Sequence, residues 1–117
     1  MNDDLVSVIM ATYNEERFLA DSIESVLNQT YRDIELLITD DCSTNKAVID
    51  ILEDFKKRDK RVKVFYLPEN QGPGKARNKS IEEAKGRFIA FCDSDDRWMP
   101  EKIEKQVALM NETDCCL

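Results

Sequence analysis

Residues 5–29 read LVSVIMATYNEERFLADSIESVLNQ and contain one strand-turn-helix unit. The first seven residues are a short run of mostly branched apolar side chains, which is typical of a buried strand. From residue 15 to about residue 29, apolar side chains recur at helical spacing, which predicts an amphipathic helix. Between the two segments lies Thr12-Tyr13-Asn14, a polar turn in which Asn14 is the expected N-cap of the helix.

The same unit recurs along the rest of the chain. Further strands are expected at residues 34–39, 62–67 and 88–92, and each is followed by a polar or glycine-containing turn and a helical pattern. Gly86 is expected at the C-terminal cap of the third helix. Strands that alternate with helices predict a mainly parallel sheet with right-handed crossovers and helices on both faces. The expected fold class is therefore α/β, a Rossmann-like three-layer α/β/α domain.

Composition limits the functions that the chain can perform. Its 117 residues fit one small domain, with 24 acidic and 17 basic side chains, a formal net charge of −7 and no histidine. The negative charge argues against unaided binding to nucleic acid or to an anionic membrane, because both attract Lys and Arg. The absence of histidine excludes Ser-His-Asp and Cys-His catalysis and leaves oxygen-ligated hard cations as the metals to consider.

The cysteines and the apolar stretches indicate the compartment. The cysteines at positions 42, 92, 115 and 116 form no CxxC pair, so neither a zinc site nor a disulfide framework is indicated. The sequence shows no signal-peptide pattern and no apolar stretch long enough to span a membrane. A cytoplasmic protein is expected. If the chain is part of a longer protein, that protein could also lie at the inner face of the membrane.

Polar clusters follow three of the four expected strands. They are Thr12-Tyr13-Asn14, Asp40-Asp41 and Asp93-Ser94-Asp95-Asp96. In a parallel sheet, ligands bind at the carboxyl ends of the strands, near the point where the strand order reverses. We therefore expect these distant positions to meet at one rim of the sheet.

The cluster at residues 93–96 is the most informative of the three. Alternate carboxylates at the end of a strand can share one Mg²⁺ or Mn²⁺ ion, which can in turn accept phosphate oxygens. The alternative is helix capping ahead of Pro100, since Asp and Ser are favoured there as well. The apolar strand directly before the cluster and the lack of other metal ligands favour metal binding.

Two other segments allow both a ligand-binding and a structural interpretation. Asp40-Asp41 can hydrogen-bond a ligand or form an Asx turn with a helix cap, and taken alone it favours the turn. GPGKAR at residues 72–77 matches neither the dinucleotide-binding fingerprint nor the Walker A loop. What remains is a glycine-permitted turn that brings Lys75 and Arg77 to a helix start, where one of them can meet a phosphate.

Taken together, five segments resemble the nucleotide-sugar-binding half of the family-2 glycosyltransferases, which are inverting enzymes with the GT-A fold. The segments are VSVIMATYNEE, LNQTY, DIELLITDDCST, GPGKARNKSIEEAKGRFIAFCDSDD and RWMPEKIEKQ. Their order and spacing extend the resemblance over nearly the whole chain. It implies that residues 1–117 form a nucleotide-sugar-binding domain truncated before the acceptor-binding half, which carries the catalytic base. No catalytic residue is therefore assigned within this chain.

The resemblance also assigns roles to individual residues. It implies that Asp93-Ser94-Asp95 is the DxD motif, in which Asp93 and Asp95 hold Mn²⁺ or Mg²⁺ and Asp95 is the direct ligand. It places Asp41 at the base and Arg77 near the ribose and diphosphate. The nucleotide-binding residues implied in this way are Ala11, Tyr13, Glu15, Asp41, Arg77 and Ser94. Cys42 stands where the family often has Gly, and its side chain is expected to restrict the backbone beside the base.

The expected parent activity is inverting transfer of a sugar from a nucleoside diphosphate sugar to the hydroxyl of an acceptor glycan or lipid, in polysaccharide biosynthesis. A UDP-sugar is the favoured donor. An apolar patch left by a missing half would allow a homo-oligomer. Two alternatives belong to other classes. A receiver-like signalling domain needs an acidic pair after its first strand, whereas this strand ends in Ala11-Thr12. A non-catalytic α/β interaction module would keep the fold without the ligand.

Overall fold

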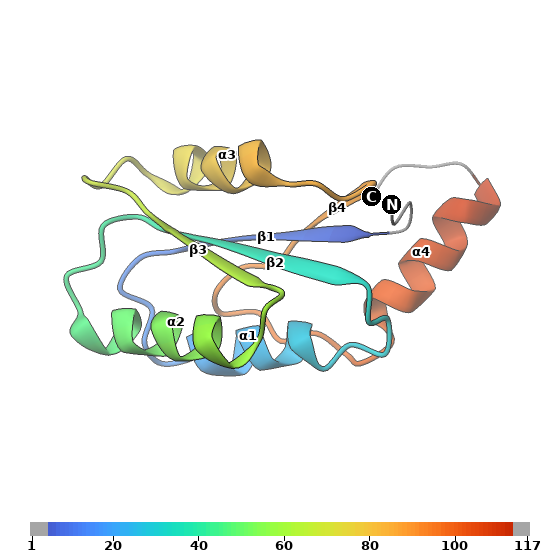
Figure 1. Ribbon diagram of the computed structural model, residues 1–117, viewed down its shortest axis with the longest axis horizontal. Helices are drawn as coiled ribbons and strands as arrows, with labels where there is room; N and C mark the ends of the chain where they lie inside the picture. Colours follow the sequence, from blue (N-terminus) through green and yellow to red (C-terminus); the bar gives the residue numbers. More distant parts are fainter. Residues whose placement is uncertain (1–4, 114–117) are drawn as a thin grey trace.

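In the computed structural model, which describes residues 5–113, strands and helices alternate along the chain (Figure 1). The strands are β1 (Val6–Thr12), β2 (Ile34–Asp40), β3 (Val62–Tyr66) and β4 (Phe88–Phe91). The helices are α1 (Leu19–Leu27), α2 (Lys46–Arg58), α3 (Pro73–Glu83) and α4 (Lys102–Thr113). The alternation predicted from the sequence is confirmed.

The strands form one parallel sheet in the order β3-β2-β1-β4. On one side of β1, β2 pairs from Val6↔Ile34 to Thr12↔Asp40. On the other side, β4 pairs from Val6↔Phe88 to Ile9↔Phe91. The chain first moves outward from β1 to β3 and then crosses to the opposite side of β1 for β4. The strand order therefore reverses at β1, where a doubly wound sheet binds its ligands.

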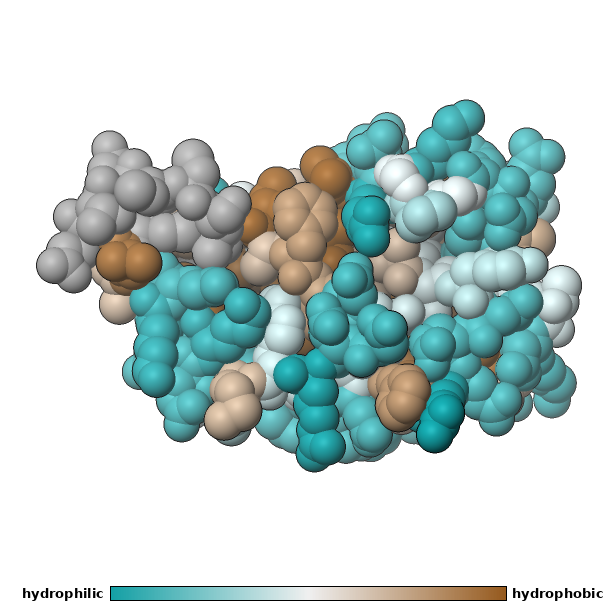
Figure 2. All heavy atoms as spheres, turned by 180° about the vertical axis from the view of Figure 1, so that it is seen from behind, coloured by the Kyte–Doolittle hydropathy of each residue, from teal (hydrophilic) through white to brown (hydrophobic). Residues whose placement is uncertain are grey.

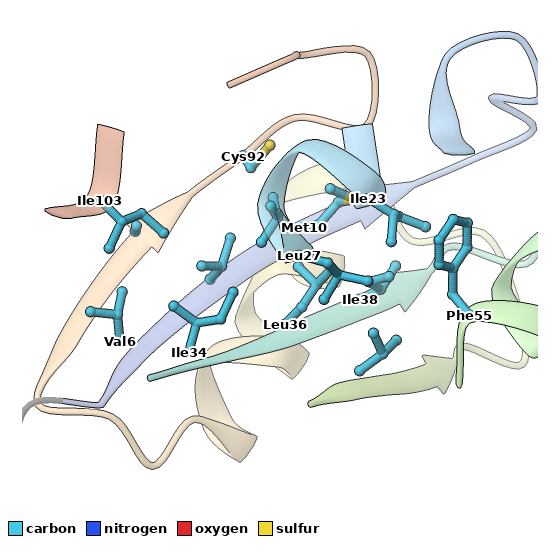
Figure 3. Packing of buried hydrophobic residues seen from close by; sticks show 14 of the residues in the cluster. Val6, Met10, Ile23, Leu27, Ile34, Leu36, Ile38, Phe55, Cys92 and Ile103 are labelled. Atoms are coloured by element: carbon cyan, nitrogen blue, oxygen red, sulfur yellow. The ribbon is translucent and has the colours of Figure 1, made fainter. Parts of the chain in front are cut away.

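Helices cover both faces of the sheet. Figure 1 shows α1 and α2 on one face and α3 on the other. The first face holds the main apolar core, in which alternate residues of β1 and β2 such as Met10 and Leu36 pack with Ile23 of α1 and Phe55 of α2 (Figure 3). On the second face α3 buries only the small residues Ala76 and Ser80. Because both central strands are buried on both faces, they read as continuous apolar runs.

The segment after β4 runs back along the α1 side of the sheet before α4 begins (Figure 1). Ile103 and Val107 of α4 are buried in the same core as α1, and Figure 3 shows Ile103 at the Val6 end of that cluster. The face seen in Figure 2 is mostly hydrophilic, with apolar atoms gathered in places. Within residues 5–113, no helix has both the length and the apolar character needed to cross a bilayer.

One expected helix boundary is wrong. The helix predicted from residue 15 begins at Leu19, with Phe18 as an N-cap that makes no side-chain capping bond. Asn14 is instead in the left-handed conformation, with φ 52°. Its Oδ1 accepts the backbone N–H groups of Thr44 and Asn45 at 2.9 and 3.0 Å. Asn14 therefore joins the loop after β1 to the start of α2, a contact across the fold that local sequence pattern does not reveal.

Candidate functional site

The polar clusters predicted to converge lie together at the carboxyl rim of the sheet. Thr12 and Asp40 are register partners at the ends of β1 and β2, and the N–H of Asp41 donates to the Thr12 carbonyl at 2.9 Å. On the other side of β1, the N–H of Cys92 donates to the Ile9 carbonyl at 3.0 Å. This pairing brings the segment that starts at Asp93 to the same rim.

A pocket of about 370 Å³ opens beside β1 at this rim. It is formed by the loops after β1, β2 and β3, and its lining residues are Ala11, Thr12, Tyr13, Asp41, Asn70, Gly72 and Pro73. Ala11, Tyr13 and Asp41 are among the residues for which a nucleotide contact is predicted. Asn70 is an addition, because its loop carries no recognisable sequence pattern. A hollow of about 430 Å³ between α1 and residues 97–100 contains none of the predicted residues.

Asp41 shapes the wall of this pocket. Its carboxylate is buried and accepts the backbone N–H groups of Gln71 at 2.7 Å and Gly72 at 2.8 Å, one on each oxygen. Gly72, with φ 94°, turns the chain into α3. A carboxylate oxygen can accept two hydrogen bonds, so Asp41 retains acceptor capacity while it holds the loop. The sequence predicts a ligand contact for Asp41 but not this bond to the loop before α3.

The turn after β2 explains the unusual backbone of Cys42. The buried carboxylate of Asp40 accepts both the N–H of Ser43 at 2.8 Å and its hydroxyl group. These bonds close a tight turn and place Cys42 in the left-handed conformation, with φ 63°. The Asx turn expected in the structural interpretation is therefore correct for Asp40, but the cap of α2 is Asn45 and not this acidic pair. Cys42 occupies a conformation that suits glycine, as the comparison with the family predicted.

The acidic cluster forms at the turn after β4. One carboxylate oxygen from each of Asp93, Asp95 and Asp96 lies within 4.8 Å of the others, and all three residues are exposed. The turn is closed by the N–H of Asp96, which donates to the Asp93 carbonyl at 3.0 Å. Carboxylate oxygens are the donors that Mg²⁺ and Mn²⁺ prefer, so this donor set fits such an ion. Asp96 was missing from the predicted pair.

Cys92, directly before this turn, does not add a thiolate. Burial, together with the neighbouring charges of Asp96 and Asp93, raises the pKa of its thiol to about 12. The side chain is buried in the core, and its sulfur lies 3.5 Å from the Asp93 carbonyl oxygen. A neutral thiol is a poor ligand for hard cations, so the site has an all-oxygen character.

Arg77 faces the acidic cluster from α3. Its Nη2 lies 3.3 Å from Oδ1 of Asp93, and both side chains remain substantially exposed. An exposed ion pair of this kind contributes little to stability, so the guanidinium can exchange its partner for a phosphate at low cost. Lys75, the other cation considered, is also exposed. The structure therefore brings one of the two predicted cations into contact with the cluster.

Three further residues at the rim, Glu15, Thr12 and Ser94, have different hydrogen-bond environments. Oε1 of Glu15 accepts the N–H of Phe18 at 3.1 Å, so this carboxylate supports the turn before α1 and lies outside the lining of the pocket. The Thr12 hydroxyl is buried and has no hydrogen-bond partner among residues 5–113. Ser94 presents its carbonyl oxygen to Ser22 of α1, which donates to it at 2.9 Å.

A parallel sheet whose reversal point carries a pocket and a carboxylate cluster is the architecture of a nucleotide-binding α/β domain. The sequence match identifies the family. Residues 7–116 match the family described as "Glycosyl transferase family 2", and the chain belongs to it.

Known proteins agree with this assignment. The chain is 48% identical over 111 residues to TuaG of Bacillus subtilis, a glycosyltransferase whose name assigns it provisionally to teichuronic acid biosynthesis. This alignment covers 95% of the chain but only 44% of TuaG. The chain thus spans less than half the length of this relative.

Solved structures share the fold. TarS of S. aureus, in complex with UDP, superposes with a TM-score of 0.84 and 34% identity, over 92% of this chain and 32% of the TarS fragment. TarS has also been solved with UDP-GlcNAc. A mannosyltransferase of Pyrobaculum calidifontis, solved with GDP-Man and Mn²⁺, has a TM-score of 0.73 over 80% of this chain and 28% of its own. At 23% identity it shows the fold alone. The predicted GT-A fold is confirmed.

Proposed function

We propose that this chain binds a nucleoside diphosphate sugar together with Mg²⁺ or Mn²⁺, as the donor half of an enzyme that transfers the sugar to an acceptor hydroxyl with inversion. The observation that carries the proposal is the cluster of the Asp93, Asp95 and Asp96 carboxylates, in which Asp93 pairs with Arg77, at the same rim of the sheet as the pocket. Membership of glycosyltransferase family 2 supports it.

In this proposal the pocket and the acidic turn bind different parts of the donor molecule. The base and ribose lie in the pocket, where half-exposed Tyr13 offers an aromatic face and Asp41 and Ala11 form the wall. The diphosphate extends toward the acidic turn, with Arg77 and Ser94 near it. UDP is the favoured nucleotide because TarS, which has the same fold at 34% identity, has been solved with UDP and with UDP-GlcNAc.

The charges explain why a cation is needed. Three carboxylates on an exposed turn repel a diphosphate, and Arg77 supplies one opposing charge. A bound divalent ion would act as a Lewis acid that stabilises the charge of the departing diphosphate. Asp93 and Asp95 would hold that ion, and Asp95 would be its direct ligand. Arg77 leaves Asp93 for the diphosphate, which fixes the orientation of the donor.

The acceptor and the catalytic base belong to a longer parent in this proposal. The chain corresponds to less than half of TuaG, and the resemblance to the family puts the base in the acceptor-binding half. Residues 1–117 are accordingly a donor-binding domain without a catalytic residue. The parent acts in the cytoplasm, or at the inner face of the membrane, on a glycan or lipid acceptor in polysaccharide biosynthesis.

Calorimetric titration of the chain with UDP, with and without Mn²⁺, tests the proposal. We expect binding that requires Mn²⁺ and that Asp95→Asn weakens at least about tenfold, because a neutral amide is a poor ligand for the ion. Asp54→Asn is the matched control, since Asp54 is an exposed residue of α2 that pairs only with Arg58 at 2.9 Å among the ion pairs of residues 5–113. Absence of binding by the unmodified chain would instead indicate a non-catalytic interaction module.

A further inference from the structure

Helix α1 and the residues just after it present three polar side chains to the segment that follows the acidic turn. Ser22 and Ser25 lie three residues apart on one side of α1, and Gln29 follows two residues after the helix ends at Leu27. Ser22 and Gln29 are almost completely buried, each with about 1% of its surface exposed. A buried polar group is costly unless it is hydrogen-bonded, so the partners of these side chains indicate their purpose.

The first contact reaches the acidic turn itself. The Ser22 hydroxyl donates to the carbonyl oxygen of Ser94 at 2.9 Å. Ser94 lies between Asp93 and Asp95, the two residues predicted to hold the metal. The bond therefore fixes the backbone between the two carboxylates from the side of α1.

The next contacts hold the chain that leaves the turn. The hydroxyl oxygen of Ser25 accepts the N–H of Trp98 at 3.1 Å, and this hydroxyl donates in turn to the Ser22 carbonyl at 2.8 Å. Gln29 uses both ends of its amide, since Nε2 donates to the Met99 carbonyl at 2.7 Å and Oε1 accepts the N–H of Ile103 at 2.9 Å. These bonds fix the backbone from the acidic turn to the first residues of α4.

The acidic turn needs this support because repulsion between its carboxylates disfavours the conformation that brings them together. Three carboxylates gathered within 4.8 Å repel one another before any cation arrives. The turn is closed by the bond from the Asp96 N–H to the Asp93 carbonyl, and Arg77 of α3 makes an exposed ion pair with Asp93. The bond from Ser22 is made to the backbone carbonyl of Ser94, so it holds the turn without occupying the carboxylates.

We infer that Ser22, Ser25 and Gln29 are positioning residues that hold the backbone of residues 94–103 so that Asp93, Asp95 and Asp96 face one ion together. The inference rests on the proposed function. It concerns metal affinity directly, because a turn that is competent for only a fraction of the time binds more weakly by that fraction. A tenfold fall in the competent fraction weakens Mn²⁺ binding about tenfold.

Two serine variants of the 117-residue chain test the inference. Ser22→Ala removes the bond to Ser94. Ser80→Ala is its match, because Ser80 is also a buried helical serine and shares one hydrogen bond, at 2.6 Å, with the Thr39 hydroxyl on the other face of the sheet. Mn²⁺ uptake in the presence of UDP is followed by the loss of the free-ion EPR signal, and stability is followed by thermal unfolding. We expect both variants to lose similar stability and Ser22→Ala alone to bind Mn²⁺ about tenfold more weakly.

A second pair of variants tests whether the hydroxyl group of Ser25 is responsible for the effect. Ser25→Ala should accelerate hydrogen exchange at the Trp98 amide and weaken Mn²⁺ binding. Ser25→Thr keeps the hydroxyl at a partly exposed position and should restore both properties. Neither change requires a new charge in the core, so both variants are expected to fold even if a substitution at Gln29 does not.

The outcomes distinguish this inference from the proposed function. If the unmodified chain takes up Mn²⁺ with UDP and Ser22→Ala binds it equally well, the positioning role is wrong and the proposed function stands. If Ser80→Ala weakens Mn²⁺ binding as much as Ser22→Ala does, the effect is one of general stability and the inference is wrong. If the unmodified chain does not take up Mn²⁺, the proposed function and the inference fail together.

Discussion

Asn14 and Cys42 at the rim of the sheet have left-handed backbone conformations although neither is glycine. Asparagine adopts this conformation more readily than most residues, and the side chain of Asn14 also accepts the N–H groups of Thr44 and Asn45 across the fold. Cys42 has weaker compensation, since its sulfur lies 3.6 Å from the Pro68 carbonyl oxygen. The strain at Cys42 is imposed by its neighbours, because Asp40 bonds both the N–H and the hydroxyl of Ser43.

Cys42→Gly should therefore stabilise the chain slightly. Relief of the left-handed strain is worth roughly 1–2 kcal/mol, and the greater freedom of glycine in the unfolded chain offsets roughly 0.5–1 kcal/mol of it. The expected net gain is about 0.5 kcal/mol in the free energy of unfolding, measured by urea titration. Cys42→Ala keeps a Cβ atom and should gain nothing. An alanine variant as stable as the glycine variant would show that the loss of the thiol, and not the backbone, is responsible.

Residues such as these mark the limit of prediction from the sequence. The departure from glycine at Cys42 was visible because a family pattern supplied the expected residue. The role of Gly86 was misjudged, since α3 ends at Glu83 and Ala84 is its C-cap. A Cβ atom on Gly86 would lie 2.6 Å from the Leu5 carbonyl oxygen and from the Ser7 hydroxyl, so this glycine serves the close approach of the chain to β1. Contacts between residues so distant in sequence leave no local periodicity to read.

The connection from α3 to β4 depends on a buried carboxylate on β2. Glu35 accepts the Ser7 hydroxyl at 2.6 Å, the backbone N–H of Lys85 at 2.7 Å and the Lys63 ammonium group at 3.0 Å. Burial by itself would raise the pKa of Glu35. The hydrogen bonds from Ser7, Lys85 and Lys63 outweigh it and hold the pKa below its ordinary value of 4.5. Strands β1 and β3 and the connection from α3 to β4 are thereby joined through one ionised group on β2.

This depressed pKa predicts how stability depends on pH. A carboxyl group with a lower pKa in the folded state contributes stability that is present above its unfolded pKa and is lost as the pH falls through the folded value. Glu35→Gln should lower the free energy of unfolding at pH 7 by about 1–3 kcal/mol and flatten its decline in acid. Urea titrations at pH 7 and across the acid range measure both effects. Glu82→Gln, on the exposed surface of α3, should change neither. An acid decline as steep in Glu35→Gln as in the unmodified chain would contradict this assignment.

The arrangement of the whole chain was predictable because the local sequence pattern indicates each strand and helix. Apolar runs such as VSVIMAT and IELLITD are long enough to be recognised as strands, and the rule for parallel sheets then brings their carboxyl ends to one rim. The acidic cluster at residues 93–96 was placed at this rim in the same way, since it comes just after β4. The role of Ser22 and Gln29 was not predicted, because their hydrogen-bond partners lie about seventy residues away in the sequence.

The whole molecule should behave as a donor-binding domain. A ligand that binds only the folded form at a hundred times its Kd adds about 2.7 kcal/mol of stability, which raises the melting temperature by several degrees. We expect this increase from UDP with Mn²⁺, a smaller one from GDP with Mn²⁺, and none from UDP with a chelator. No catalytic base is assigned in the chain, so UDP-GlcNAc with Mn²⁺ should release little or no UDP in a coupled assay. Metal-dependent turnover by these 117 residues would show that the base lies within them, and would place the division between donor and acceptor halves elsewhere.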